Sequence, residues 1–184
     1  STDLIRRKWL SNHFKGLVYS LNHKINDMNI TIGGSNNKYD GDHFGNVIWM
    51  KHASNANYNY EYYSNTGVKI DNNLYAKINY DFSNSTNIYF DLQSRSINYE
   101  FVGYDENGNL ADQEVDLSFL NPKFGFSHFL NTNKRLYASY AVGNKEPSRN
   151  DYVESSPNSR PKAETLHDLE LGYRTVSYTH LRAH

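Results

Sequence analysis

Residues 70–82, with the sequence IDNNLYAKINYDF, decide the fold because apolar and polar side chains alternate along them. One face carries Ile70, Leu74, Ala76, Ile78, Tyr80 and Phe82, and the other carries Lys69, Asp71, Asn73, Tyr75, Lys77, Asn79 and Asp81. A period of two predicts a β-strand with one apolar face. The run exceeds the about 5–6 residues of a typical globular strand. It suits the about 9–11 residues that a tilted strand needs to cross a bilayer.

The next segment repeats this pattern, which indicates that two such strands lie side by side. Its apolar residues alternate with polar ones, namely Ile88, Phe90 and Leu92 against Tyr89, Asp91, Gln93 and Arg95. Beyond Ser96 the apolar residues change face, to Ile97, Tyr99 and Phe101. This change predicts either a bulge or the point where the strand leaves the lipid.

The connections between the expected strands differ sharply in length. Residues 24–27, 83–86 and 131–134 are tight polar turns, whereas residues 35–68, 103–116 and 144–166 read as long polar loops. Outer-membrane β-barrels have short periplasmic turns and long extracellular loops. We therefore expect an all-β fold, an antiparallel transmembrane β-barrel fragment of about seven meandering strands.

The charged face of these strands predicts a polar interior. A Lys or Arg on the lipid face near mid-bilayer costs about 2–4 kcal/mol. We therefore expect six polar residues to face the barrel lumen: Lys77, Asp81, Asp91, Gln93, Arg95 and Glu170. The alternative is a soluble, secreted β-sandwich binding module, whose strands also alternate but are usually shorter.

The composition limits the possible functions. The 184 residues carry a net charge of -1, so a nucleic-acid partner is not expected. There is no Cys, which excludes disulfides and thiolate metal sites. The sequence lacks a phosphate-binding Gly-rich loop, a Gly-x-Ser-x-Gly elbow and a His-Glu-x-x-His pair, so we predict no catalytic residue, cofactor or metal site.

Both ends of the sequence read as cut. The chain begins at Ser1 without an export signal, which we expect to lie upstream. Residues 176–184, VSYTHLRAH, resemble the translated read-through of a sequencing adaptor. We therefore expect residues 1–174 to form part of one barrel domain and residues 175–184 to be non-native, with a genuine strand as the alternative.

The last third of the chain resembles the barrel domain of TonB-dependent outer-membrane receptors. The resemblance rests on the order of five segments: NPKFG at 121–125, LYASYAV at 136–142, EP at 146–147, PKAE at 161–164 and LELGY at 169–173. In addition, residues 39–45, YDGDHFG, resemble loop segments of Bacteroidetes receptors. The chain departs from the family where Lys162 and Ala163 separate Pro161 from Glu164, since the family commonly has Pro directly before Glu.

The resemblance implies a barrel of about 22 strands filled by an N-terminal plug domain, with the plug and the remaining strands missing from this sequence. It implies an outer-membrane receptor of a Gram-negative cell that imports a scarce nutrient, foremost a ferric siderophore or similar iron chelate, with energy delivered by the TonB complex through the plug. Vitamin B12 and oligosaccharides are alternative substrates. Haem is less favoured because residues 146–157 contain no His. A passive porin and an adhesive barrel remain alternatives of a different class.

The polar connections supply the candidate ligand-binding residues. These are Tyr39, Asp42, His43 and Trp49 in the first expected loop, and Arg149, Asp151 and Tyr152 in the third. Aromatic and cationic groups can bind an anionic or aromatic ferric chelate. The alternative for each residue is an ordinary solvated loop position.

Overall fold

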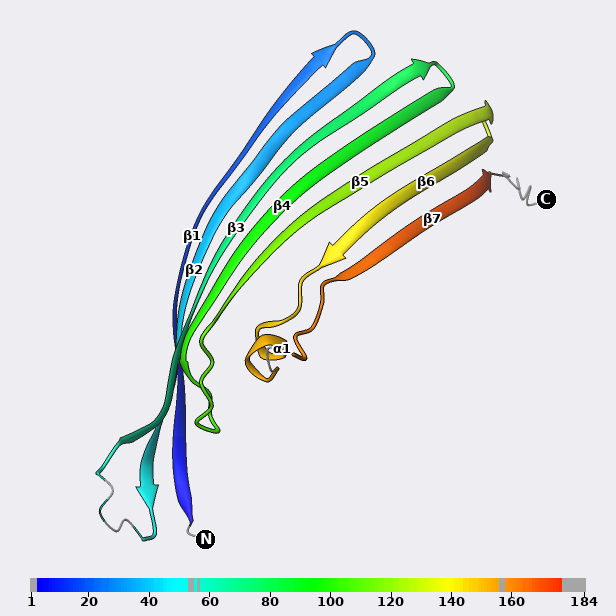
Figure 1. The fold of residues 1–184 in the computed structure, drawn as a ribbon. Helices are drawn as coiled ribbons and strands as arrows, with labels where there is room; N and C mark the ends of the chain where they lie inside the picture. Colours follow the sequence, from blue (N-terminus) through cyan, green and yellow to red (C-terminus); the bar gives the residue numbers. More distant parts are fainter. Residues whose placement is uncertain (1–2, 53–54, 56, 156–157, 177–184) are drawn as a thin grey trace, which may run out of the picture.

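The computed structural model describes residues 3–52, 55, 57–155 and 158–176. In chain order the elements are β1 (Leu4–Ile25), β2 (Met28–Met50), β3 (Tyr60–Ser83), β4 (Thr86–Tyr104), β5 (Gln113–Asn131), β6 (Lys134–Lys145), α1 (Arg149–Val153) and β7 (Glu164–Thr175). The strands form one antiparallel sheet in which each strand pairs with its neighbours in sequence (Figure 1). The predicted seven-stranded antiparallel meander is confirmed.

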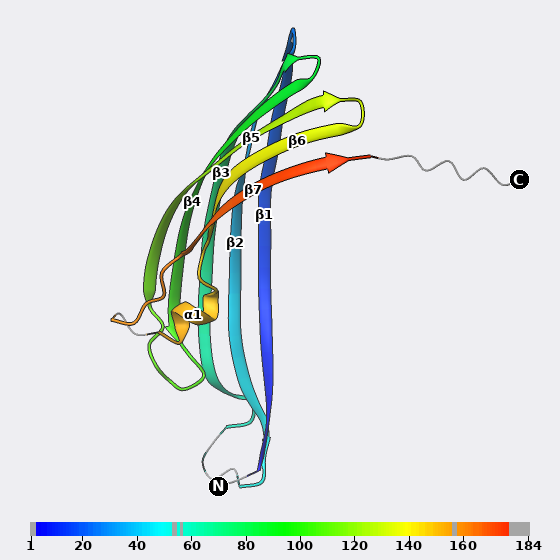
Figure 2. The same ribbon diagram turned by 90° about the vertical axis from the view of Figure 1, so that its right-hand side faces the viewer.

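The sheet bends, and α1 lies on the inner side of the bend (Figures 1 and 2). We call the face that contacts α1 the inner face and the opposite face the outer face. Strand register assigns alternate residues to these faces. Because Tyr99 and Phe101 contact Tyr152 of α1, they and their register partners belong to the inner face.

The outer face is apolar near the short turns. One row of paired residues crosses six strands there without a polar side chain, running from Ile30 through Ile78, Phe90, Phe124 and Tyr140 to Leu169. We call this region the apolar band. Its apolar and aromatic outer-face residues include Leu17, Tyr19, Leu21, Ile25, Met28, Ile30, Ile32, Leu74, Ala76, Ile78, Tyr80, Ile88, Phe90, Leu92, Leu120, Phe124, Phe126, Leu136, Ala138, Tyr140, Val142, Leu169, Leu171 and Tyr173. Three histidines lie on the same face, namely His128, His167 and, on β1, His23, which pairs with Ile30.

The inner face beneath the band is polar. Lys77, Asp91 and Lys123 are register neighbours on consecutive strands, so charges of alternating sign lie side by side. Lys77 Nζ is 3.7 Å from Asp91 Oδ2. The same strands therefore have an apolar outer face and a charged inner face. This pattern is typical of a wall between lipid and a polar lumen.

Tyrosines of the inner face lie across glycines of the neighbouring strand. Gly125 pairs with Tyr89, and Gly172 pairs with Tyr137. A Cβ added to Gly125 would lie 2.0 Å from a ring carbon of Tyr89. The absence of a side chain at this position therefore lets the ring lie flat against the wall.

The turns confirm part of the predicted connection pattern. Strand pairing closes directly around residues 26–27, 84–85 and 132–133. The longer connections at residues 105–112 and 146–163 agree with the second and third predicted loops. All the longer connections lie at the end of the sheet opposite these short turns (Figure 1).

The first predicted loop, residues 35–68, is wrong. β2 continues to Met50 and β3 begins at Tyr60, and the two strands pair along almost their whole length. Beyond the apolar band both faces of this hairpin are largely polar, so the sequence shows no hydrophobic period there. The ladder is supported instead by polar cross-strand pairs, such as Asn36 Nδ2 donating to Asn72 Oδ1 over 2.8 Å.

The change of apolar face beyond Ser96 does not come from a bulge, because the register of β4 with both neighbours is regular there. Above the apolar band, the inner face becomes the one that packs. Ile97 and Phe101 are almost fully buried on it, with exposures of 2% and 1%. Phe101 forms a small core with Val115 and Tyr152. The bulge is thus excluded by the regular register, and the second predicted explanation, that the strand leaves the lipid at this point, stays a prediction.

The sheet is open within the part of the chain that the structure describes. β1 pairs only with β2, and β7 pairs only with β6, so each has one free edge. The described residues form a single sheet with no second sheet stacked on it, which contradicts the β-sandwich alternative. Among these residues no helix is long and apolar enough to cross a membrane. Residues 177–184 lie outside the described residues, and the prediction of a non-native end stays a prediction.

Candidate functional site

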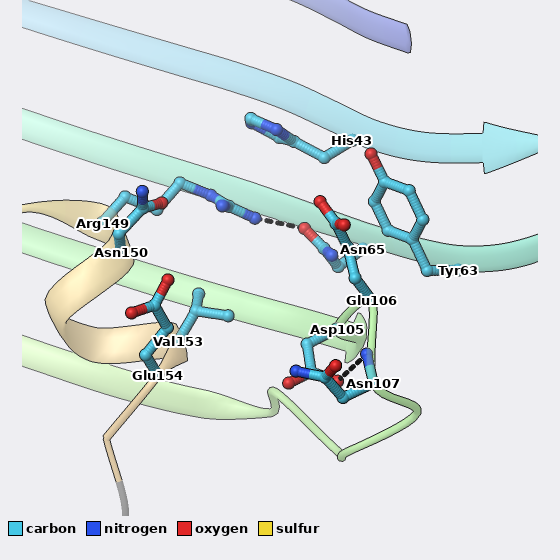
Figure 3. A pocket seen from close by; sticks show the side chains of 10 residues that line it. All are labelled: His43, Tyr63, Asn65, Asp105, Glu106, Asn107, Arg149, Asn150, Val153 and Glu154. Atoms are coloured by element: carbon cyan, nitrogen blue, oxygen red, sulfur yellow. Dashed lines mark hydrogen bonds between the residues drawn. The ribbon is translucent and has the colours of Figure 1, made fainter. Parts of the chain in front are cut away.

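The candidate site is a cavity on the inner face beyond the apolar band (Figure 3). Its volume is about 290 Å³. It is lined by three parts of the chain: His43, Tyr63 and Asn65 from β2 and β3, Asp105, Glu106 and Asn107 from the β4–β5 connection, and Arg149, Asn150, Val153 and Glu154 from α1 and its C-cap. Polar groups from distant segments therefore converge on one space.

The short helix α1 is formed by a capping box. The Ser148 side chain accepts a hydrogen bond from the Asp151 backbone N–H, and the Asp151 carboxylate accepts one from the Ser148 N–H over 2.7 Å. These bonds satisfy donors that a helix start leaves unpaired. Hydrogen bonding of its carboxylate to the side chain and backbone N–H of Ser148 lowers the pKa of Asp151. Asp151 thus stabilises the helix that carries Arg149.

Tyr152 anchors α1 to the wall. It is 2% exposed and its ring contacts Tyr99 and Phe101, with the Phe101 ring centroid 6.0 Å away. Its backbone carbonyl accepts a hydrogen bond of 3.0 Å from Gln113 Nε2. Its hydroxyl has no hydrogen-bond partner among the described residues. Packing rather than polar contact therefore holds this side chain.

Arg149 spans the cavity from α1 to β3. Its Nη2 donates to Asn65 Oδ1, and its guanidinium carbon lies 5.9 Å from the Phe101 ring centroid. Asn65 is itself held by donating to the Tyr104 carbonyl over 2.9 Å. The buried Nε of Arg149 has no hydrogen-bond partner within the described chain. This donor is therefore buried and unsatisfied in the described structure.

A network of ion pairs ties the start of the same loop to the wall. Glu146 pairs with Lys69 and, over 3.3 Å, with Arg95 Nη2. Arg95 also holds Asp71 through two bonds of 3.0 and 2.6 Å, a bidentate geometry. These four side chains are 19–26% exposed, so water screens them only in part. They line or border a second cavity of about 440 Å³ on the other side of α1, which Asp151 also lines.

Two of the three acidic residues that line the first cavity have side-chain or backbone partners, and the third is Glu154. Glu106 pairs with Lys8 Nζ at 2.6 Å. Asp105 Oδ1 accepts from the backbone N–H groups of Asn107 and Asn109 at 2.9 and 2.8 Å, which makes a tight hairpin tip and lowers the pKa of this carboxyl. The site therefore retains Arg149 as its cation with spare hydrogen-bonding capacity.

Burial affects the titratable groups around Arg149. Burial and the nearby Arg149 charge lower the pKa of His43, which keeps its ring neutral at pH 7. Burial raises the pKa of Tyr99 to about 12. The cavity thus presents the positive charge of Arg149 beside neutral hydroxyl, imidazole and amide groups and the carboxylates of Asp105, Glu106 and Glu154.

The predicted ligand-binding residues separate into two groups. The structure brings His43 and Arg149 together in one cavity, and Tyr39 lies on the same face, close enough to Tyr99 to affect its pKa. Asp42 lies on the outer face, where its carboxylate accepts a hydrogen bond from Thr66 Oγ1 over 2.7 Å. Trp49 lies near the end of β2 with half of its surface exposed. The four β2 residues were expected in a loop and lie instead in a strand.

Asp151 and Tyr152 have structural roles in this conformation. Asp151 caps α1, and Tyr152 is buried between α1 and the wall. Direct contact of Tyr152 with a ligand requires α1 to leave the wall. The ligand contacts of all seven residues stay predictions.

The residues expected in the lumen share one face. Lys77, Asp81, Asp91, Gln93, Arg95 and Glu170 all lie on the inner face by strand register. Their exposure to a lumen depends on closure of the barrel and stays a prediction.

Sequence reasoning missed Asn65, Tyr63, Glu106 and Glu146. The first two fell in the wrongly assigned loop, and the others needed contacts between segments 98 and 77 residues apart. The alternation in the sequence already placed Lys69, Asp71 and Arg95 on one face. Two cations and one carboxylate on that face indicate that a second acidic partner, such as Glu146, should lie nearby. Within the described ranges, no three His, Cys, Asp or Glu side chains gather as a metal site.

Comparison with known proteins identifies the fold. No protein-family model matches the chain, and no curated protein matches its sequence. Among solved structures, the ferric yersiniabactin uptake receptor FyuA from Yersinia pestis is similar, with a TM-score of 0.56 and 12% identity over 96% of this chain. The ferric citrate transporter FecA in its unliganded form is also similar, with a TM-score of 0.60 and 14% identity over 92% of this chain.

These matches show that the chain has the fold of a segment of a β-barrel wall. The chain spans 29% of the FyuA chain and 25% of the FecA chain. At such identities the likeness concerns the fold alone. The resemblance of residues 39–45 to Bacteroidetes receptors is not tested by these matches and stays a prediction.

Proposed function

We propose that this chain is part of the wall of a TonB-dependent outer-membrane receptor that actively imports a scarce nutrient, foremost a ferric siderophore or similar iron chelate. The observation that carries the proposal is the contrast between the two faces of one sheet. An apolar row crosses six strands on the outer face, and an ion-paired row lies beneath it on the inner face.

The free edges of β1 and β7 support a larger barrel. In lipid each unpaired backbone group costs several kcal/mol, so a membrane-spanning sheet must close. The similar structures are several times longer than this chain and carry the same wall geometry. We propose that further strands close the wall and that a plug domain contacting TonB fills the lumen, including the inner-face residues Lys77, Asp91 and Arg95.

The cavity at Arg149 supports an anionic ligand. Ferric chelates carry carboxylate, catecholate or hydroxamate oxygens, which suit the guanidinium of Arg149. The matched structures are named for ferric yersiniabactin uptake and ferric citrate transport, which favours iron over other nutrients. His43 and Tyr39 lie on the same inner face and are proposed as further contacts.

The test is uptake by cells that express the full-length protein containing this chain. We expect energy-dependent accumulation of radioactive iron supplied as ferric citrate or as a ferric hydroxamate or catecholate, and its loss when the inner membrane is de-energised. Uptake that persists without energy would establish a passive porin instead. Uptake of none of these chelates, with transport of cobalamin or an oligosaccharide, would overturn the iron assignment.

A matched pair of variants tests the cavity. Arg149→Ala should weaken chelate binding by about 10- to 150-fold, since it removes a charged hydrogen bond worth about 1.5–3 kcal/mol. Arg160→Ala removes the same charge from the same connection, at a residue that does not line the cavity, and should leave binding unchanged. Equal affinities of the two variants would remove Arg149 from the proposed site.

A further inference from the structure

We infer that Asn107, at the tip of the β4–β5 connection, is a site of self-modification by deamidation, and that the product adds a negative charge to the cavity at Arg149. Asn107 and Arg149 line this same cavity (Figure 3). The modification follows from the local chemistry of the tip. Its effect on ligand binding rests on the proposed function.

The sequence places the reaction at one position. Asn107 is followed by Gly108, and no other Asn in the chain precedes a Gly. In deamidation the backbone nitrogen of the following residue attacks the amide carbon of the Asn side chain, so a side chain on that residue hinders the approach. A Cβ added to Gly108 would meet no heavy atom within 4 Å beyond the adjoining residues. Neither Gly108 nor its surroundings therefore block the attacking nitrogen.

The structure leaves the reacting groups free to move. Residues 106–110 are all exposed, and the Asn107 side chain makes no hydrogen bond with any described residue. The Gly108 N–H donates to the Asp105 carbonyl over 3.1 Å, and this single exposed bond can be replaced by one to water. Exposed loop tips open at a small cost in free energy. The attacking geometry is therefore reached by a local change at the tip.

A second sequence of this reactive kind is protected by the fold. Asp40 precedes Gly41, and an Asp-Gly sequence can form the same five-membered ring. Both residues lie within β2, where they pair with β1 on one side and with β3 on the other. A strand held between two neighbours cannot turn its backbone nitrogen toward the preceding side chain. The tip at Asn107 is thus the reactive position.

The reaction is balanced with water as its co-reactant. A bond forms between the Gly108 nitrogen and Asn107 Cγ, and the bond between Cγ and Nδ2 breaks. Nδ2 leaves as ammonia, which takes up the proton lost from the Gly108 nitrogen. Water then opens the five-membered ring to an aspartate or an isoaspartate, whose new acid group releases its proton to solvent. No group is oxidised or reduced.

The product changes the cavity in two ways. A carboxylate replaces an uncharged amide, so the charge of Arg149 meets one more negative charge in the same cavity. An isoaspartate also adds a methylene group to the backbone of the turn that Asp105 holds through the N–H groups of Asn107 and Asn109. Both changes disfavour an anionic ligand at Arg149.

The first experiment follows the full-length protein in detergent during incubation in warm, mildly alkaline buffer. Peptide mapping by mass spectrometry measures conversion at each Asn and separates aspartate from isoaspartate. Conversion at Asn107 should be the fastest in the chain and should exceed that at Asn84, an exposed Asn that precedes Ser85 in a short turn. It should quicken as the pH rises, because the attacking amide must lose its proton.

A matched pair of variants tests the assignment. Asn107→Gln should stop conversion at this position, since the longer side chain has to form a six-membered ring. Asn84→Gln should leave conversion at Asn107 unchanged. Conversion at Asn107 no faster than at Asn84 overturns the inference and leaves the proposed function intact.

The second experiment measures binding of ferric citrate to the full-length protein. Asn107→Asp carries the aspartate form and should bind about 1.5–5-fold more weakly than wild type. Asn84→Asp adds the same charge at the opposite end of the sheet and should bind as wild type does. Equal affinities of Asn107→Asp and wild type overturn the effect on the cavity. Fast conversion at Asn107 in a protein that binds no ferric chelate upholds the modification site and counts against the proposed function.

Discussion

A charge placed on the outer face at Ile78 tests the membrane wall most directly. Ile78 pairs with Ile30 and Phe90, so apolar side chains flank it on both neighbouring strands. It lies four residues from Leu74 along β3, about 13 Å along the strand and about 10 Å in depth for a strand tilted by about 35–45°. Arg or Lys at such a depth costs about 2–4 kcal/mol.

We therefore expect Ile78→Arg to lower the free energy of unfolding in lipid vesicles by about 2–4 kcal/mol. Two controls separate face from depth. Asn79→Arg places the same charge on the inner face one residue away, and Ile70→Arg places it on the outer face beyond the band. Both should cost about 0–1 kcal/mol.

The assay is urea unfolding of the full-length protein reconstituted in vesicles, followed by tryptophan fluorescence. Equal losses for Ile78→Arg and Asn79→Arg would show that the two faces meet the same medium and would refute the wall assignment. A loss at Ile70 as large as at Ile78 would instead place the bilayer further toward the long loops.

Three further predictions concern the loop that carries α1. Tyr152→Ala should speed hydrogen exchange at α1 because it removes a ring from the core with Phe101 and Val115. Tyr152→Phe should leave the exchange rate unchanged, since the hydroxyl has no hydrogen-bond partner among the described residues. Glu146→Gln should lower the opening free energy of the same segment by about 1–2 kcal/mol, because Lys69 and Arg95 lose a charged partner, and unchanged exchange would show that the ion pairs contribute nothing. Burial and the nearby Arg149 charge lower the pKa of His43 in the folded state, so the contribution of its neutral ring to stability is complete above the ordinary pKa near 6.5 and falls as the pH drops below it. Hydrogen exchange at α1 should therefore quicken as the pH falls below about 6.5, and His43→Gln should abolish this pH dependence.

The alternation at residues 70–82 predicted both the strand and its faces because one side of it meets an apolar medium. The same rule failed for residues 35–50, where Asn36, Lys38, Asp40 and Asp42 occupy the outer face of a strand beyond the apolar band. Hydrophobic periodicity reports an apolar environment and not the strand itself. Strands whose two faces are both polar pair through their backbones without a hydrophobic period of two in the sequence.

The candidate site was predictable only in part for a related reason. Arg149 and His43 were chosen for their chemistry, and both line the cavity. Asp42 was chosen with its neighbour His43, but adjacent residues of a strand point to opposite faces. Tyr152 was chosen as an exposed aromatic, and its burial depends on Phe101, 51 residues earlier, through a fold-back that no local pattern encodes.

The wall is not equally tall around its circumference. β2 and β3 have 23 and 24 residues, while β6 and β7 have 12 each. In β2 and β3 the backbone is paired along almost the whole strand, so an inserted residue would shift the register of the neighbouring strands. Beyond the shorter strands β6 and β7, the chain continues as the connection at residues 146–163, which is not part of the strand ladder. Insertions and substitutions between β6 and β7 therefore change a connection outside the strand ladder and leave the pairing of the sheet intact. If the proposed function holds, new ligand specificities should arise in this connection first.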